Sequence, residues 1–269
     1  MKGRQLVSNL PGALAFHTPT SAQELGWVQP DLALCRSRGH AGDFPLAALE
    51  IMDERQMAIL NTNGSPAVHS RQWAEQPTLF LKFSGTTDAV RSDAARAANI
   101  IRLHLPAAAA AAAADKAGGA GSVGSAEGGA VRHDEHAAGG HAMWSTDAAV
   151  PVSRLAEMVD WAKAECGRLG LFASVIGHMG DGNFHVAIMH DPREPAQTSA
   201  VARCVRRMTD HAIEMDSTVN GKHGIGIGKK AYLRDELDDE AVGFMRALKL
   251  AVDPKWIMNP DKVFDETDE

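Results

Sequence analysis

The chain has 269 residues, of which 45% are hydrophobic and 23% charged, and a formal net charge of −7 at pH 7. This composition is ordinary for a globular chain that can bury a substantial core. The negative charge argues against nucleic acid or an anionic membrane as the main partner, and no apolar run reaches the roughly 18 residues of a membrane helix. The three cysteines are far apart and form no CxxC pair, which favours a reducing compartment over a disulfide framework.

The first 42 residues show no sustained period, and we expect them to be a poorly ordered segment. Lys2 and Arg4 precede the first acidic residue, Glu24, which faintly resembles a mitochondrial presequence. Beyond this segment, periodicity predicts a helix over 44–61, a strand over 78–85 and a helix over 86–105. Ala and Gly dominate residues 107–142, and this composition cannot offset the entropy of ordering the chain. We therefore expect a flexible insertion there.

The pattern resumes with an expected strand over 145–152 and a helix that Ser153 is positioned to cap. Strands are then expected over 171–178 and 183–189, followed by helices over 197–215 and 239–252. This order of elements predicts an α+β fold, with one antiparallel sheet, helices on one of its faces and a helical C-terminal segment.

The most specific motif is GHMGDGNFH, residues 177–185. If Asp181 and Gly182 form a two-residue turn, His178 and His185 lie opposite each other on neighbouring strands. Their side chains then share one face at a spacing that suits two imidazoles on one metal ion. Asn183 offers an amide beside them.

A second glycine-rich segment, NGKHGIGIGKK, spans residues 220–230 and contains His223. Its glycines allow backbone to approach a ligand closely, and the histidine is a candidate acid or base. A tight turn with a surface histidine explains the same residues equally well.

The two segments together resemble the C-terminal domain of FAD-linked oxidases of the vanillyl-alcohol oxidase superfamily. The similarity covers about 43–105 and 143–265, and is greatest to cytochrome-linked D-lactate dehydrogenases and to glycolate oxidase and D-2-hydroxyglutarate dehydrogenase relatives. It implies a ferredoxin-like cap over residues 43–265, interrupted by the insertion at 107–142, with FAD held mainly by a separate domain that this sequence lacks. It also implies oxidation of a D-2-hydroxy acid, D-lactate first, with cytochrome c or a flavoprotein as electron acceptor. A mitochondrial location follows from the same resemblance, with the cytoplasm as the alternative.

The resemblance also implies roles for individual residues. His223 is the expected catalytic base, Asn183 lies at the substrate, and His178 and His185 bind a divalent cation such as Zn²⁺ or Mn²⁺. In the family a glutamate supplies the third metal ligand, and here Lys222 occupies its position. An ammonium group repels a divalent ion, so this departure argues against a three-ligand site.

Two other functions remain open at this point. The first is a catalytically impaired or truncated homologue that keeps the fold as a binding module. The second is a metal-binding protein that uses His178, His185 and a carboxylate such as Asp181.

Overall fold

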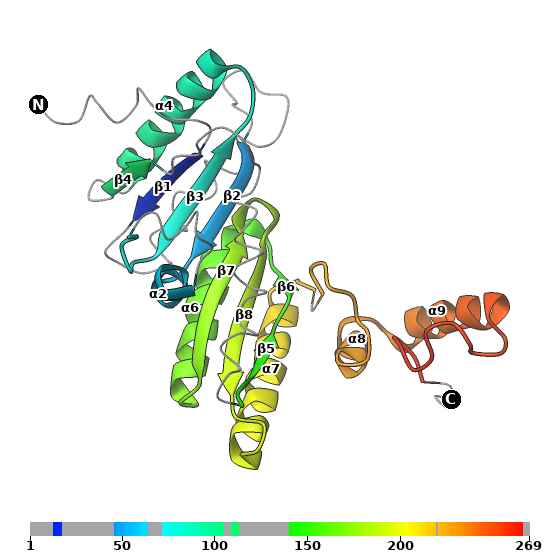
Figure 1. Cartoon of the computed structure of the whole chain (residues 1–269). Helices are drawn as coiled ribbons and strands as arrows, with labels where there is room; N and C mark the ends of the chain where they lie inside the picture. The colour runs from blue at the N-terminus through cyan, green and yellow to red at the C-terminus, as the bar shows by residue number, and fades with distance from the viewer. Residues whose placement is uncertain are drawn as a thin grey trace, which may run out of the picture.

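A computed structural model of the chain describes residues 13–17, 46–63, 72–104, 109–112, 140–218 and 220–265. An eight-stranded sheet forms its centre, in the order β4-β1-β3-β2-β7-β8-β5, with β6 also paired to β8 (Figure 1). All strand pairs are antiparallel, which confirms the predicted α+β class. The strands are β1 (Ala13–His17), β2 (Leu46–Met52), β3 (Thr78–Phe83), β4 (Ala109–Ala112), β5 (Ala142–Ser145), β6 (Ala148–Ala149), β7 (Phe172–His178) and β8 (Asn183–His190).

Three long helices cover one face of the sheet, and a short one packs on the opposite face. The described helices are α2 (Glu54–Asn63), α4 (Thr87–His104), α6 (Leu155–Arg168), α7 (Pro195–Glu214), α8 (Lys230–Glu236) and α9 (Asp239–Val252), with 3-10 turns η2 (Val152–Arg154) and η3 (Met179–Asp181). Helices α4, α6 and α7 bury their apolar stripes in one cluster with the sheet, whereas α2 belongs to a second cluster. Helices α8 and α9 stand away from the sheet (Figure 1).

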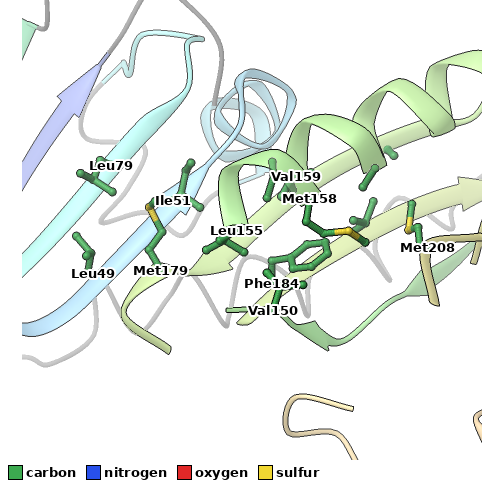
Figure 2. Packing of buried hydrophobic residues seen from close by; sticks show 14 of the residues in the cluster. Leu49, Ile51, Leu79, Val150, Leu155, Met158, Val159, Met179, Phe184 and Met208 are labelled. Carbon is green, nitrogen blue, oxygen red and sulfur yellow. The ribbon is translucent and has the colours of Figure 1, made fainter. Parts of the chain in front are cut away.

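The main core lies between the sheet and the three long helices. Figure 2 shows Leu49 and Ile51 of β2 beside Met179, and Phe184 of β8 beneath Leu155 of α6. All five side chains are at most 3% exposed. Since side chains alternate along a strand, the residues between these core positions point to the other face. That face carries the candidate site.

The helix predicted over 44–61 is wrong in its first half. Leu46–Met52 form strand β2, which pairs with β3 and β7, and the helix begins only at Glu54. Pairing on both sides and burial of Leu49 and Ile51 outweigh a local pattern that suits either element.

The prediction that Ser153 caps helix α6 is also wrong. Helix α6 is preceded by the 3-10 turn η2, its N-cap is Arg154, and no side chain forms a capping hydrogen bond.

The segments 1–42 and 107–142 lie mostly outside the described residues. Two short pieces of them are strands, because Ala13–His17 pair with Ala109–Ala112 and with β3. Strand pairing is made by backbone groups and requires no large side chain. This explains how an alanine run forms an edge strand.

The two parts of the sheet meet at a short junction. Strands β2 and β7 pair over three residues each, with Glu50 opposite His178, Ile51 opposite Gly177 and Met52 opposite Ile176. The pairings on either side are longer, with six residue pairs between β2 and β3 and seven between β7 and β8. Gly177 permits the close approach, because a Cβ atom there would lie 2.7 Å from Cγ2 of Ile51.

None of the described helices has the length and hydropathy that a membrane crossing requires.

Candidate active site

The histidine hairpin has a different register from the one predicted. His178 lies opposite Asn183, and His185 lies opposite Ile176, because η3 and Gly182 form the connection in place of a two-residue turn. The shift moves the partner of each histidine by two residues. Since side chains alternate with a period of two, both histidines still point to the same face, with ring centroids 5.4 Å apart.

That face gathers polar side chains from three neighbouring strands. Glu50 of β2 is opposite His178 of β7, which is opposite Asn183 of β8, and His185 follows two residues later. Residues opposite each other in an antiparallel pair project to the same side. The site is therefore built on the face that α4, α6 and α7 leave uncovered.

His178 has a charged group at each ring nitrogen. Its Nδ1 lies 2.5 Å from Oε2 of Glu50, and its Nε2 lies 2.6 Å from Nζ of Lys222. An ionised carboxylate only accepts and an ammonium only donates. The ring therefore carries its proton on Nδ1 and offers the Nε2 lone pair to Lys222.

Asp147 holds the glycine-rich segment against the sheet. Its side chain is fully buried, and Oδ2 accepts the backbone N–H groups of Lys222 and His223, both at 2.8 Å. Oδ1 accepts the side-chain amide of Asn183 at 2.9 Å. Burial alone would raise the pKa of Asp147, but these donors and the Lys229 ammonium hold it well below its usual range. The carboxylate is thus ionised and saturated with donors.

Gly221 leaves the space that the hydrogen bonds of Asp147 to Asn183 and to the glycine-rich segment require. A Cβ atom at this position would lie 1.9 Å from Nδ2 of Asn183 and 2.7 Å from Oδ1 of Asp147. Any side chain here would displace the amide that binds the carboxylate, so the position requires glycine.

His185 is buried beneath His223. The two rings are stacked, with centroids 4.8 Å apart and an interplanar angle of 6°. Nδ1 of His185 donates to the carbonyl oxygen of Thr146 at 3.0 Å. Burial lowers the pKa of His185 to about 4, against the raising effect of Thr146 and Asp147. His185 is therefore neutral at pH 7, and its Nε2 carries a lone pair.

Two buried acceptors on this face have no hydrogen-bond partner among the described residues. They are Nε2 of His185 and Oδ1 of Asn183, in side chains that are 8% and 5% exposed. The amide orientation of Asn183 is fixed, because its Nδ2 donates to Asp147 and to the carbonyl oxygen of Ala148. A buried acceptor without a partner is costly, so this pair indicates a place for a ligand with a donor group.

A cavity of about 290 Å³ lies beside the cluster, bordered by β5, α7 and the segment 223–229. Of the predicted site residues, only His223 lines it. Lys229 also borders it, where burial lowers the pKa of the lysine and its Nζ donates to the backbone oxygen of Asp147 at 3.0 Å. The cavity is therefore a neighbour of the cluster and does not contain the two unpaired acceptors.

The donor atoms do not fit a divalent cation. His178 uses its Nε2 lone pair on Lys222, which leaves Nε2 of His185 as the available imidazole donor of the predicted pair. Asp147, His185 and His223 also have ligand-type atoms within 4.8 Å of one another. However, both oxygens of Asp147 accept hydrogen bonds, and the His185 nitrogen near it is Nδ1, which faces a carbonyl oxygen.

Sequence reasoning thus placed four of the six central residues, namely His178, Asn183, His185 and His223, and it noted Lys222 as a departure. It missed Glu50 and Asp147. Glu50 lies in a segment expected to be a helix, and Asp147 lies in an expected strand without a motif around it. The one available signal was the alternation of Glu50 with Leu49 and Ile51, which places an acidic side chain on the uncovered face.

The fold is an α+β domain, and the sheet face opposite α4, α6 and α7 carries histidines and acceptors suited to proton transfer at a small polar ligand. The chain belongs to the family described as FAD linked oxidases, C-terminal domain, whose model matches residues 33–263.

Two curated relatives are about one third identical to the chain within the aligned segments. It is 33% identical over 243 residues to "D-lactate dehydrogenase [cytochrome], mitochondrial" of Kluyveromyces lactis, covering 87% of this chain and 40% of that protein. It is 36% identical over 118 residues to "Glycolate oxidase subunit GlcD" of Bacillus subtilis, covering 44% of this chain and 25% of that protein. The chain therefore spans less than half the length of these relatives.

Among solved structures, p-cresol methylhydroxylase with substrate bound has the same fold. The TM-score is 0.63 at 14% identity, and the match covers 96% of this chain and 53% of that one. A 4-ethylphenol oxidase from Gulosibacter chungangensis gives a TM-score of 0.60, also at 14% identity, over 96% of this chain and 55% of that one. These likenesses support the cap fold expected from the sequence.

Proposed function

We propose that this chain is the substrate-binding part of a FAD-linked dehydrogenase that oxidises a small D-2-hydroxy acid, with D-lactate to pyruvate as the leading reaction. Family membership and the names of the relatives support the reaction class. The observation that carries the proposal is the pair of buried, unpaired acceptors, His185 Nε2 and Asn183 Oδ1, next to the exposed ring of His223.

A 2-hydroxy acid suits this arrangement. On binding, its one hydroxyl hydrogen is donated to a buried acceptor, Asn183 Oδ1 or His185 Nε2, and we propose Asn183 as a substrate contact. In the reaction the same hydrogen turns to His223, whose exposed ring accepts it as general base. FAD, when bound, would supply the two-electron acceptor that this oxidation at C2 requires. We assign no residue of this chain to contacts with FAD.

The relatives' names extend the proposal to partners and location. D-lactate dehydrogenases of Kluyveromyces lactis and Saccharomyces cerevisiae are named as cytochrome-linked and mitochondrial. We propose the same location here, and cytochrome c or an electron-transferring flavoprotein as acceptor.

A chimera tests the proposal. The 269-residue chain replaces the matching C-terminal segment of the Kluyveromyces lactis enzyme, and flavin bleaching is followed without oxygen. D-lactate is expected to reduce the flavin, whereas L-lactate is not.

The base is tested in the same chimera. His223→Gln is expected to lower the rate of reduction at least 100-fold, whereas His211→Gln, on α7 behind the sheet, leaves it unchanged. A folded chimera with bound FAD that D-lactate does not reduce would support the non-catalytic binding module instead.

A further inference from the structure

We infer that the ammonium group of Lys222 is the built-in cation of this site and takes the place of a divalent metal ion. The cluster would then bind a small hydroxy acid through Lys222 and the two buried acceptors, without a metal. The binding of a hydroxy acid rests on the proposed function. The replacement of the metal ion by Lys222 does not.

Nζ of Lys222 occupies the position that a metal ion would take on His178. It lies 2.6 Å from Nε2 of His178, and that lone pair is the one His178 would use to bind an ion. An ion bound there would have to displace the ammonium from the same nitrogen. The opposite nitrogen, Nδ1, is not available, because it lies 2.5 Å from Oε2 of Glu50 and donates its proton to that oxygen.

Neighbouring residues hold Lys222 in this position. The backbone N–H of Lys222 is fixed to Asp147 at 2.8 Å, and Glu50 sets the orientation of the His178 ring that receives Nζ. Glu50 and His178 are each 13% exposed at the side chain. A carboxylate, an imidazole and an ammonium thus form one chain across β2, β7 and the glycine-rich segment. Glu50 and His178 act here as positioning residues.

The atoms around the Lys222 ammonium match the chemistry of a 2-hydroxy acid. His185 Nε2 and Asn183 Oδ1 are neutral acceptors, and Lys222 adds a positive charge beside them. A 2-hydroxy acid suits the acceptors and the ammonium, because its hydroxyl group donates a hydrogen bond and its carboxylate is an anion. As the hydroxyl proton leaves toward His223, the ammonium stabilises the charge that develops on oxygen. A metal ion supplies the same stabilisation in other enzymes.

The test measures metal content and needs no turnover. The tag-free 269-residue chain is equilibrated with Zn²⁺ or Mn²⁺, dialysed and analysed by elemental mass spectrometry, with calorimetry for affinity. Because the chain has 12 histidines, site-bound metal is defined as the amount lost on His178→Ala. Wild-type protein is expected to lose none. Lys222→Glu is expected to gain about one equivalent that His178→Ala abolishes.

Lys222→Met is the matched control, since it removes the charge without adding a ligand. Urea midpoints confirm that each variant is folded. A wild-type equivalent of metal that depends on His178 would overturn the inference, as would a Lys222→Glu protein that binds no more metal than Lys222→Met. A metal-free wild-type chain whose chimera does not oxidise D-lactate would instead disprove the proposed function alone.

Discussion

Replacing Gly221 by alanine tests whether the hydrogen bonds accepted by Asp147 stabilise the site. The new methyl group would lie 1.9 Å from Nδ2 of Asn183, so the amide must leave Asp147. The segment cannot simply move away, because the backbone N–H groups of Lys222 and His223 are bound to the same carboxylate. The substitution therefore breaks a buried hydrogen bond to a charged group.

The magnitude follows from two costs and one gain. Loss of a hydrogen bond to a charged acceptor costs about 1.5–3 kcal/mol, and overpacking adds about 1–3 kcal/mol. Alanine restricts the unfolded chain, which returns about 0.4–1 kcal/mol. We expect a net loss of about 3 kcal/mol in the free energy of unfolding. At an m-value of about 2–3 kcal/mol/M, the urea midpoint then falls by about 1 M.

The same segment offers a matched control. A Cβ atom at Gly228 would meet no atom within 4 Å, and its φ is not positive. Gly228→Ala should therefore change the free energy of unfolding by less than about 0.5 kcal/mol. Equal urea midpoints for the two variants would refute the reasoning, because they would mean that Asn183 and Asp147 do not limit the space at Gly221.

Three further predictions concern the charges and protons of the site. Asp147→Asn should destabilise the protein by about 3–5 kcal/mol, because it leaves the partly buried Lys229 without its anion; a urea midpoint equal to wild type would contradict this. The folded-state pKa of His185, about 4, lies below the ordinary 6.5, so the unfolded chain binds the extra proton and stability falls as pH drops from about 6.5 toward 4. Linkage gives a loss of at most about 2 kcal/mol in the free energy of unfolding between pH 7 and 5, because partial solvent access reduces the effect. His185→Asn should remove this part of the pH dependence of stability in urea titrations. An unchanged pH dependence would assign it to other groups. In nitrogen-15 NMR at pH 7, His178 and His185 should both carry their proton on Nδ1, and a proton on Nε2 of either ring would exclude the hydrogen bonds described above.

The sequence predicted the face of the site better than its register. The two-residue turn was wrong, yet His178, Asn183 and His185 stayed together because a shift of two residues preserves the side of a strand. A shift of one residue would have separated them. Alternation is a local property, whereas the conformation of the connection through η3 depends on contacts of Gly182 with the backbone of Val150.

Glu50 and Asp147 were not predicted, because their roles depend on pairing between distant segments. Glu50 is 128 residues from His178 in the chain, and Asp147 is 76 from the His223 amide it binds. The alternation of Glu50 with Leu49 and Ile51 indicates a face but no partner, and no short-range pattern marks Asp147. The helix wrongly expected across Leu46–Met52 concealed Glu50 further, since it placed that residue on a helix surface.

The three-residue junction between β2 and β7 has a consequence for how the site is lost. Glu50 and His178 are one of its three residue pairs, so the hydrogen bond that orients the histidine is also one of the few links between the two parts of the sheet. Opening of this junction would break the series of side-chain contacts from Glu50 through His178 to Lys222, while the strands on either side of the junction remain paired. Local opening of this kind requires less free energy than global unfolding. Backbone amides at Glu50–Met52 should accordingly exchange with solvent faster than those at the centre of β8, and function should fail on heating before the fold does.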